Sequence, residues 1–224
     1  MKTLIFGTSY IAGQQSRYVF GLWLNLVQKL NPDSDILVVD SASPDMPGFL
    51  GRVKYLQLGD NIGHLGHGGQ DGWGRAFCAG LQHAIDHGYD SVVHIETDLL
   101  FARPVGEIMD KMSRSRVLAA APVAAPFQFI ETALMFLSVG YVQSINLIGK
   151  YDWHKAEQTP FPEVRIERII QERLFSLPLK GLRNDLDLLT VKNMAGMFPD
   201  GVDWLTHCRD PAVYREFLRV NEHG

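Results

Sequence analysis

The chain has 224 residues, of which 46% are hydrophobic and 21% charged, and its formal net charge is −4. This length fits one domain with a sizeable core, and the slightly acidic balance predicts no binding to nucleic acid. Two cysteines, Cys78 and Cys208, are too few for a disulfide framework, which favours a reducing, cytoplasmic compartment. No stretch reaches the roughly 20 apolar residues of a transmembrane helix, so we expect at most peripheral contact with a membrane.

Short apolar runs and amphipathic segments alternate along the first hundred residues. Continuous apolar strands that alternate with helices are typical of a mostly parallel sheet covered on both faces. Ligands of such sheets bind at the carboxyl ends of the strands, so we expect functional residues directly after them. The pattern predicts strands over 3–6, 36–39, 53–58 and 91–95, and helices over 14–30 and 74–87 with a C-cap at Gly88.

The second half of the chain has a less regular pattern. No linker rich in Ser, Gly or Pro separates it from the first half, which predicts a single domain over 1–224. The expected fold class is α/β, with a mixed but mostly parallel sheet between helices and an irregular second half. The pattern predicts strands over 116–123, 130–137 and 186–191, and helices over 139–148, 162–174 and 211–220.

Polar residues follow three of the predicted strands, at Thr8-Ser9-Tyr10, Asp40-Ser41 and Glu96-Thr97-Asp98. Glu96 and Asp98 are two residues apart at a strand end, so their side chains can point the same way. Two carboxylates of this kind suit Mg²⁺ or Mn²⁺ shared with substrate phosphates. The alternative is a solvated strand end in which Asp98 caps the next turn.

The order of these segments over about residues 3 to 105 resembles the start of the GT-A-type nucleotide-sugar glycosyltransferases. The stretch from Tyr89 to Asp98 is similar to the one that carries the Asp-x-Asp signature of that family, with Glu96 in place of the first Asp. The resemblance implies a GT-A-like fold with a nucleotide-sugar-binding half over 1–105 and an acceptor-side half over 106–224. It also rests on Gly7-Thr-Ser9, Val38-Val-Asp-Ser-Ala-Ser43, Asp60-Asn-Ile-Gly63 and Gly74-Arg-Ala76.

The resemblance implies metal-dependent transfer of a sugar from a nucleoside diphosphate sugar to a sugar or glycan acceptor. Mn²⁺ or Mg²⁺ would be bound by Asp98 and by a late histidine, His207, with Glu96 beside them. Asp40 would contact the base or ribose, although an Asx-turn with Ser41 explains it equally. The alternatives for two other residues are a surface position for Arg75 and a packing role for His207. The residues assigned to the donor site are Thr8, Ser9, Tyr10, Asp40, Arg75 and Glu96.

An inverting transfer also needs a base for the acceptor hydroxyl. The resemblance places such a base well after the metal motif, often at the start of a helix. Glu163 fits this position, and Glu167 is predicted one turn on, on the same face. The alternative is that both merely favour the helix N-terminus and pair with Arg168 or Arg173. Glu131 is a further candidate for contact with the acceptor.

A glycine-rich segment over 63–72 carries His64 and His67. A zinc-binding pair is one interpretation, but no cysteine or third histidine with metal-ligand spacing lies near it. The glycines favour backbone close to a ligand or a mobile loop.

Two other enzyme classes with similar sheets fit less well. A sugar-phosphate nucleotidyltransferase would need basic residues in the loop after the first strand, and Gly7 to Gly13 contains none. A dinucleotide-dependent dehydrogenase would need Gly-x-Gly-x-x-Gly there, which the same segment lacks. A nucleotide-sugar-binding module without catalysis stays an alternative, because Glu96 replaces the first Asp of the signature.

Overall fold

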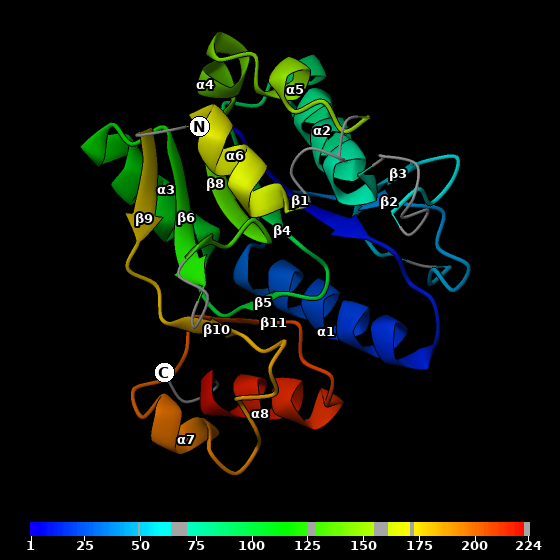
Figure 1. Cartoon of the computed structure of the whole chain (residues 1–224), viewed down its shortest axis with the longest axis vertical. Helices are drawn as coiled ribbons and strands as arrows, with labels where there is room; N and C mark the ends of the chain where they lie inside the picture. Colours follow the sequence, from blue (N-terminus) through cyan, green and yellow to red (C-terminus); the bar gives the residue numbers. More distant parts are fainter. Residues whose placement is uncertain (49, 64–70, 125–128, 155–160, 171–172, 222–224) are drawn as a thin grey trace.

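The larger of two sheets forms the centre of the molecule (Figure 1). The computed structural model describes residues 1–48, 50–63, 71–124, 129–154, 161–170 and 173–221. In spatial order the larger sheet contains β3 (Lys54–Gln57), β2 (Asp35–Asp40), β1 (Thr3–Ser9), β4 (Ser91–Ile95), β8 (Leu134–Ser138), β6 (Ala119–Ala124) and β7 (Phe129–Ile130), and β9 (Leu174–Leu177) pairs with β6.

The larger sheet is mixed but mostly parallel, as predicted. Strands β3, β2, β1 and β4 run parallel to one another, and β9 runs parallel to β6. Strand β8 is antiparallel to both β4 and β6. A second, three-stranded sheet contains β10 (Gly181–Arg183), β11 (Trp204–Thr206) and β5 (Leu100–Phe101). It joins a strand from the first half of the chain to two strands from the second.

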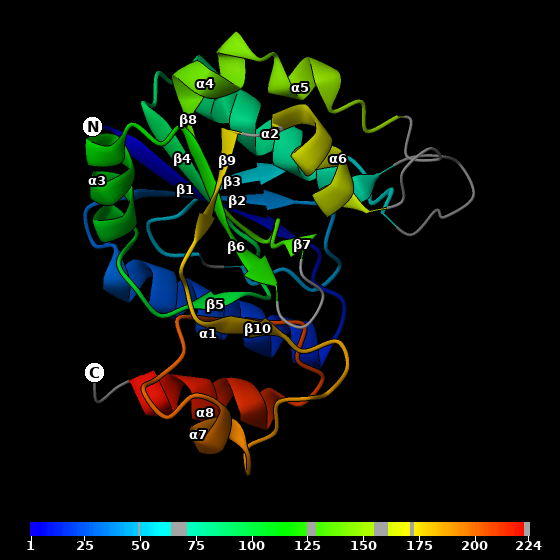
Figure 2. The same ribbon diagram turned by 60° about the vertical axis from the view of Figure 1, so that its left-hand side comes forward.

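Helices cover both faces of the larger sheet (Figure 2). The alternation of side chains along β1 sends Ile5 into the core below α1 and sends Leu4 and Phe6 into the core below α2. One face carries α1 (Gln14–Leu30) and α3 (Val105–Ser115), with α7 (Met194–Met197) and α8 (Pro211–Asn221) beyond them; the other carries α2 (Gly72–Asp86), α4 (Val139–Ser144), α5 (Leu147–Lys150) and α6 (Pro162–Ile170).

Gly7 allows α1 to pack closely against β1. A Cβ atom at this position would lie 2.6 Å from the Trp23 ring of α1 and 2.8 Å from Thr97 Cγ2, closer than van der Waals contact permits. Thr97 belongs to the turn after β4, between Glu96 and Asp98. The glycine therefore positions both a core helix and the segment that carries the two candidate carboxylates.

Several predicted elements in the second half are wrong in their extent or type. No strand forms over 186–191, because Asp187 has a left-handed backbone (φ 51°) and Asn184 bonds to the backbone of Leu189. The helix predicted over 139–148 is two short helices, α4 and α5. The helix predicted over 162–174 is α6, and Leu174 already belongs to β9. The strand predicted over 130–137 is split between β7 and β8.

Two further findings concern the described part of the chain as a whole. None of its helices is both long and apolar enough to cross a membrane. Cys78 and Cys208 are both buried and both free, so they form no disulfide.

Candidate active site

Glu96 and Asp98 lie in a tight turn directly after β4. The backbone N–H of Leu99 donates to the Glu96 carbonyl at 2.8 Å, which closes the turn. Thr97, between the two carboxylates, is buried and donates its hydroxyl to the Thr8 carbonyl at 3.0 Å. The turn is thereby fixed to the carboxyl end of β1, the neighbouring parallel strand.

His207 reaches this turn because β11 pairs antiparallel with β5, which follows the turn directly. The Thr206 hydroxyl donates to Asp98 Oδ1 at 3.2 Å, and the Tyr214 hydroxyl of α8 donates to the Asp98 carbonyl at 2.8 Å. His207 itself has a left-handed backbone, with φ of 58°. Such a conformation is rare for residues other than glycine and is concentrated at functional sites.

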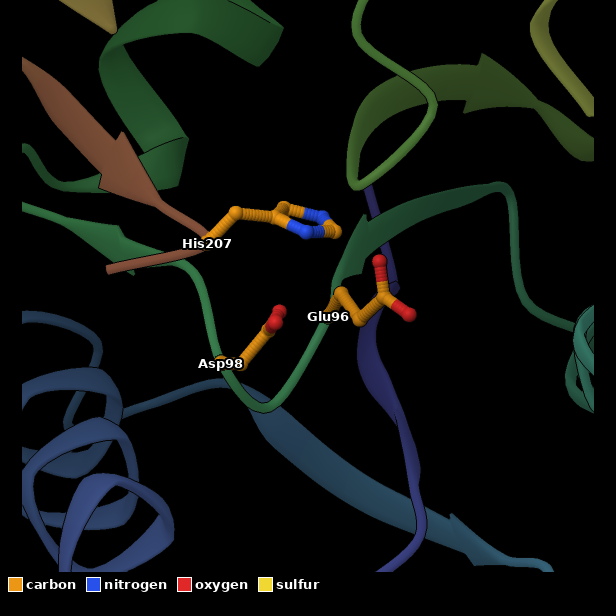
Figure 3. Close-up of side chains that lie close together, drawn as sticks. All are labelled: Glu96, Asp98 and His207. Atoms are coloured by element: carbon orange, nitrogen blue, oxygen red, sulfur yellow. The ribbon is translucent and has the colours of Figure 1, made fainter. Parts of the chain in front are cut away.

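Glu96, Asp98 and His207 converge in one space beside the turn (Figure 3). One potential ligand atom from each residue lies within 4.8 Å of the other two. Burial of the carboxyl and the nearby charge of Asp98 raise the pKa of Glu96 well above its usual range. A divalent cation among these groups would offset that repulsion, and two carboxylates with an imidazole are donors suited to Mn²⁺. The residues therefore fit the metal that the sequence predicts.

A cleft of about 230 Å³ adjoins this cluster, and Glu96 lies in its wall. The Ser9 hydroxyl is buried there without a hydrogen-bond partner among the described residues, which leaves it free for a ligand. The described residues that line the cleft are Thr8, Ser9, Tyr10, Ser41, Asn61, Gly63, Gly72, Trp73, Ala76 and Glu96.

A neutral histidine orients Thr8 in the wall of the cleft. His94 is fully buried, and its Nδ1 lies 2.8 Å from the Thr132 carbonyl, which can only accept a hydrogen bond. Nε2 therefore accepts from the Thr8 hydroxyl at 3.1 Å. Burial lowers the pKa of His94 to about 4, so the ring is uncharged at neutral pH. The fixed direction of the Thr8 proton leaves the lone pairs of its oxygen for other partners.

Two predicted donor-site residues already have partners in the protein. Asp40 is fully buried and accepts from the backbone and side chain of Ser43 and from the Tyr55 hydroxyl, the last at 2.8 Å. These contacts fix the turn after β2 through Ser43 rather than through Ser41, which itself lines the cleft. A contact of Asp40 with the base or ribose stays a prediction. Arg75 forms an ion pair with Asp60, a carboxylate near the cleft.

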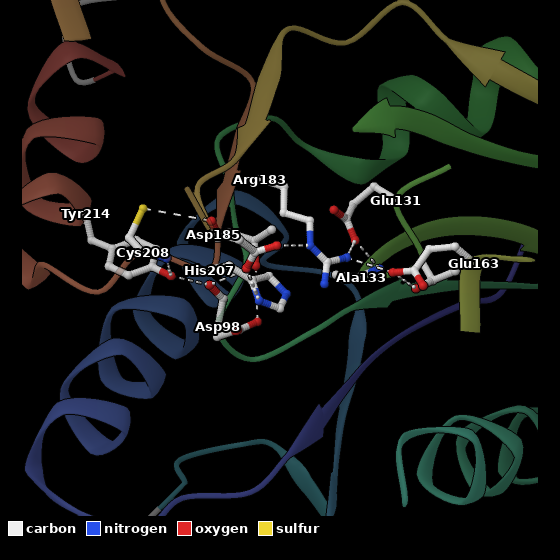
Figure 4. Close-up of polar contacts among 11 residues, drawn as sticks. Asp98, Glu131, Ala133, Glu163, Arg183, Asp185, His207, Cys208 and Tyr214 are labelled. Carbon is white, nitrogen blue, oxygen red and sulfur yellow. Dashed lines mark hydrogen bonds and ion pairs between the residues drawn. The ribbon is translucent and has the colours of Figure 1, made fainter. Parts of the chain in front are cut away.

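The candidate acceptor carboxylates surround one arginine, in what we term the Arg183 cluster: Arg183, Glu131, Glu163 and Asp185 (Figure 4). Arg183 Nη1 lies 2.7 Å from Glu163 Oε1 and 3.6 Å from Glu131 Oε1, and its Nε lies 2.7 Å from Asp185 Oδ2. Glu131 has no exposed surface, and burial raises the pKa of its carboxyl to about 7. Its Oε2 has no partner among the described residues.

Glu163 and Glu167 lie one turn apart on α6, but only Glu163 is buried in the Arg183 cluster, whereas Glu167 is exposed. Their role as acceptor base stays a prediction. His64 and His67, the pair considered for zinc, lie outside the described residues.

Solved structures with a similar arrangement of elements include several glycosyltransferases. The galactosyltransferase LgtC, solved with donor and acceptor sugar analogues, superposes with a TM-score of 0.59 at 10% identity, covering 100% of this chain and 96% of that one. The chain has the GT-A fold. A TarS fragment from S. aureus, residues 1–349 in complex with UDP, shares it with a TM-score of 0.57 at 11% identity, covering 99% of this chain and 64% of that fragment.

Two further comparisons concern mannosyltransferases. PcManGT from Pyrobaculum calidifontis, in complex with GDP-Man and Mn²⁺, shares the GT-A fold with a TM-score of 0.54 at 13% identity, covering 79% of this chain and 55% of that one. An undecaprenyl-phosphate mannosyltransferase from Micrococcus luteus is 36% identical over 78 residues. That match spans 34% of this chain and about a third (31%) of the length of that protein. No family model matches the sequence.

The sequence analysis did not identify two residues of the site, Arg183 and Asp185. Arg183 is the last residue of β10 and Asp185 lies two residues after it, and this strand of only three residues gives no periodic signal. The one available signal is the charged run Arg183-Asn-Asp185-Leu-Asp187 between apolar segments.

Proposed function

We propose that the chain transfers a glycosyl group from a nucleoside diphosphate sugar to a sugar or glycan acceptor, with a divalent metal ion. The observation that carries this proposal is that Glu96 belongs to two neighbouring features of the site. It lies in the wall of the cleft and also belongs to the cluster with Asp98 and His207. A ligand in this cleft would place an anionic group next to a metal in the cluster, which is the arrangement a diphosphate leaving group requires.

Each side of the site has a distinct role in this proposal. Thr8, Ser9 and Tyr10 would bind the nucleotide, because their polar groups line the cleft at the end of β1. Asp98 and His207 would bind Mn²⁺ or Mg²⁺, with Glu96 completing the oxygen shell or accepting from bound water. The ion would neutralise charge on the departing diphosphate. PcManGT in complex with GDP-Man and Mn²⁺ supports this assignment by its shared fold.

The acceptor side of the proposal concerns the base that would deprotonate the acceptor hydroxyl. Glu163 and Glu167 are the proposed bases if the reaction inverts the anomeric carbon. Glu163 is bound to Arg183 at 2.7 Å, so it would have to release that contact before accepting a proton. Arg75 and Asp40 act here through their protein partners, by fixing Asp60 and the turn around Ser43 beside the cleft.

Hydrolysis of a panel of UDP- and GDP-sugars, with Mn²⁺, with Mg²⁺ and with EDTA, tests the proposal. We expect release of nucleoside diphosphate with at least one donor, lost with EDTA and reduced at least about 100-fold in Asp98→Asn. Asp187→Asn is the matched control, because Asp187 pairs with the exposed Arg209 outside the site. Metal-independent release would contradict the metal role, and binding of donors without any turnover would favour the non-catalytic module.

A further inference from the structure

Asp185 lies between the candidate metal ligands and the Arg183 cluster. Its Oδ1 lies 3.1 Å from His207 Nδ1, and its Oδ2 accepts from Arg183 Nε at 2.7 Å. Both oxygens of this one carboxylate are therefore committed, each to a different neighbour. Since two fixed contacts define the plane of a carboxylate, Asp185 has a single favoured orientation.

This orientation decides which nitrogen of His207 carries the proton. An ionised carboxylate can only accept hydrogen bonds, so a neutral His207 must donate its Nδ1–H to Asp185. The lone pair is then on Nε2, which is the tautomer required for metal binding through Nε2. Among the described residues, no other contact of the His207 ring would select one tautomer over the other.

The backbone that carries Asp185 is fixed to the strand that carries His207. Strands β10 and β11 are parallel, with Arg183 opposite Thr206. The N–H of Asn184 donates to the Thr206 carbonyl at 3.0 Å. The buried Asn184 side chain also exchanges two hydrogen bonds with the backbone of Leu189, at 2.7 and 3.0 Å. These bonds close the 184–189 loop and position Asp185 directly beside the residue after β11.

Arg183 connects this arrangement to the buried carboxylates of the acceptor side. The same guanidinium contacts Asp185, Glu163 and Glu131. Only about a fifth (19%) of the Arg183 side chain is exposed, so its position is set by these contacts rather than by solvent. The left-handed backbone of His207 needs such support, because few L-residues adopt it without strain.

We propose that Asp185 is a positioning residue, which acts by holding His207 in the Nδ1–H tautomer so that Nε2 faces a divalent cation shared with Asp98. The metal in this inference rests on the proposed function, whereas the contact between Asp185 and His207 does not. Arg183 in turn holds Asp185, so a carboxylate–histidine pair is built from the ends of β10 and β11.

Two measurements on Asp185→Ala test this inference without any turnover. The first is the ¹⁵N spectrum of the His207 ring at pH 8 in the metal-free protein. We expect wild type to show protonated Nδ1, and the variant to show a shift toward protonated Nε2. The second is a calorimetric Mn²⁺ titration with UDP, and separately with GDP, without acceptor. We expect Mn²⁺ affinity to fall at least about tenfold in the variant.

Two controls separate this role from general damage. Asp187→Asn removes a carboxylate from the same loop but not from the contact with His207, and asparagine tolerates the left-handed backbone at this position, so both measurements should match wild type. Asp185→Asn retains the shape of the side chain, and it replaces Asp185→Ala if thermal melting shows that the alanine variant does not fold. We expect Asp185→Asn to lower the Mn²⁺ affinity in the same direction, by a smaller factor.

The outcomes distinguish the inference from the proposed function. An Asp185→Ala variant with protonated Nδ1 and wild-type Mn²⁺ affinity would overturn the inference and leave the proposed function standing. A wild-type protein that shows protonated Nδ1 but binds no Mn²⁺ with either nucleotide would overturn both, and would leave Asp185 as a structural partner of His207 alone.

Discussion

The cleft around Thr8 and the Arg183 cluster are stabilised by different kinds of interaction. The cleft is built from consecutive parallel strands, and its buried histidine, His94, is neutral and hydrogen-bonded on both nitrogens. The Arg183 cluster contains four ionisable side chains from three separate segments, and two of its carboxylates are buried. The difference indicates that the cleft depends on local chain order, whereas the Arg183 cluster depends on charges that meet only in the folded state.

The largest effect on stability should come from Arg183→Met. This change would leave the buried Glu163 without the guanidinium that lies 2.7 Å from it, and removing one partner of a buried ion pair costs about 3 kcal/mol or more. Urea denaturation measures the free energy of unfolding. Arg209→Met is the control, because Arg209 is 78% exposed and its pair with Asp187 should contribute about 0.5 kcal/mol at most. A loss below 1 kcal/mol in Arg183→Met would contradict the ionic account of the cluster.

The stability of the two regions should change with pH in opposite directions. The folded-state pKa of His94, about 4, is below its ordinary 6.5, so His94 lowers the stability as the pH falls from 6.5 to 4. The folded-state pKa of Glu131, about 7, is above its ordinary 4.5, so Glu131 lowers the stability as the pH rises from 4.5 to 7. In wild type these two contributions oppose each other between about pH 4.5 and 6.5.

Glu131→Gln should remove one of these opposing contributions. The free energy of unfolding should then rise more steeply with pH in this window, by up to about 1.4 kcal/mol per pH unit relative to wild type. Denaturant titrations at pH 4.5, 5.5 and 6.5 give the slope for each protein. Parallel slopes in wild type and Glu131→Gln would show that Glu131 is ionised in the folded state, contrary to its burial.

The sequence predicted the first half of the fold well. The order of β1, α1, β2, β3, α2 and β4 is confirmed, because β1, β2 and β4 contain continuous apolar runs and each long helix has one apolar stripe. Helix α3 was missed although Val105, Ile108, Met109 and Met112 have helical spacing and are buried. In that case the signal was present in the sequence.

The second half of the fold could not be predicted to the same degree. Strands β5, β7, β10 and β11 have only two or three residues each, too few for any periodicity. The alternating residues Leu186 and Leu188 are typical of a strand, but both are exposed, and the hydrogen bonds between Asn184 and Leu189 hold this segment in a loop. The position of His207 beside Asp98 was predicted through a family resemblance, and only the pairing of β11 with β5 explains it physically.

Gly7→Ala should lower the free energy of unfolding by a smaller amount, about 2 kcal/mol. The added methyl group would meet the Trp23 ring and Thr97 at under 3 Å, and overpacking of this kind costs about 1–3 kcal/mol. Gly21→Ala is the matched control, since Gly21 lies within α1 with open space around it and should gain about 0.5–1 kcal/mol. Equal stabilities of the two variants by thermal melting would contradict the close packing of α1 on β1.

Calorimetric titration of Mn²⁺ into wild type and His207→Ala, each with and without a nucleoside diphosphate, tests the central claim most directly. His83→Ala is the control, because His83 lies on α2 outside the cluster. The claim predicts weak Mn²⁺ binding to wild type alone, much tighter binding with UDP or GDP, and at least about a tenfold loss of that tight binding in His207→Ala only. The same Mn²⁺ affinity with and without nucleotide, or in His207→Ala and wild type, would contradict it.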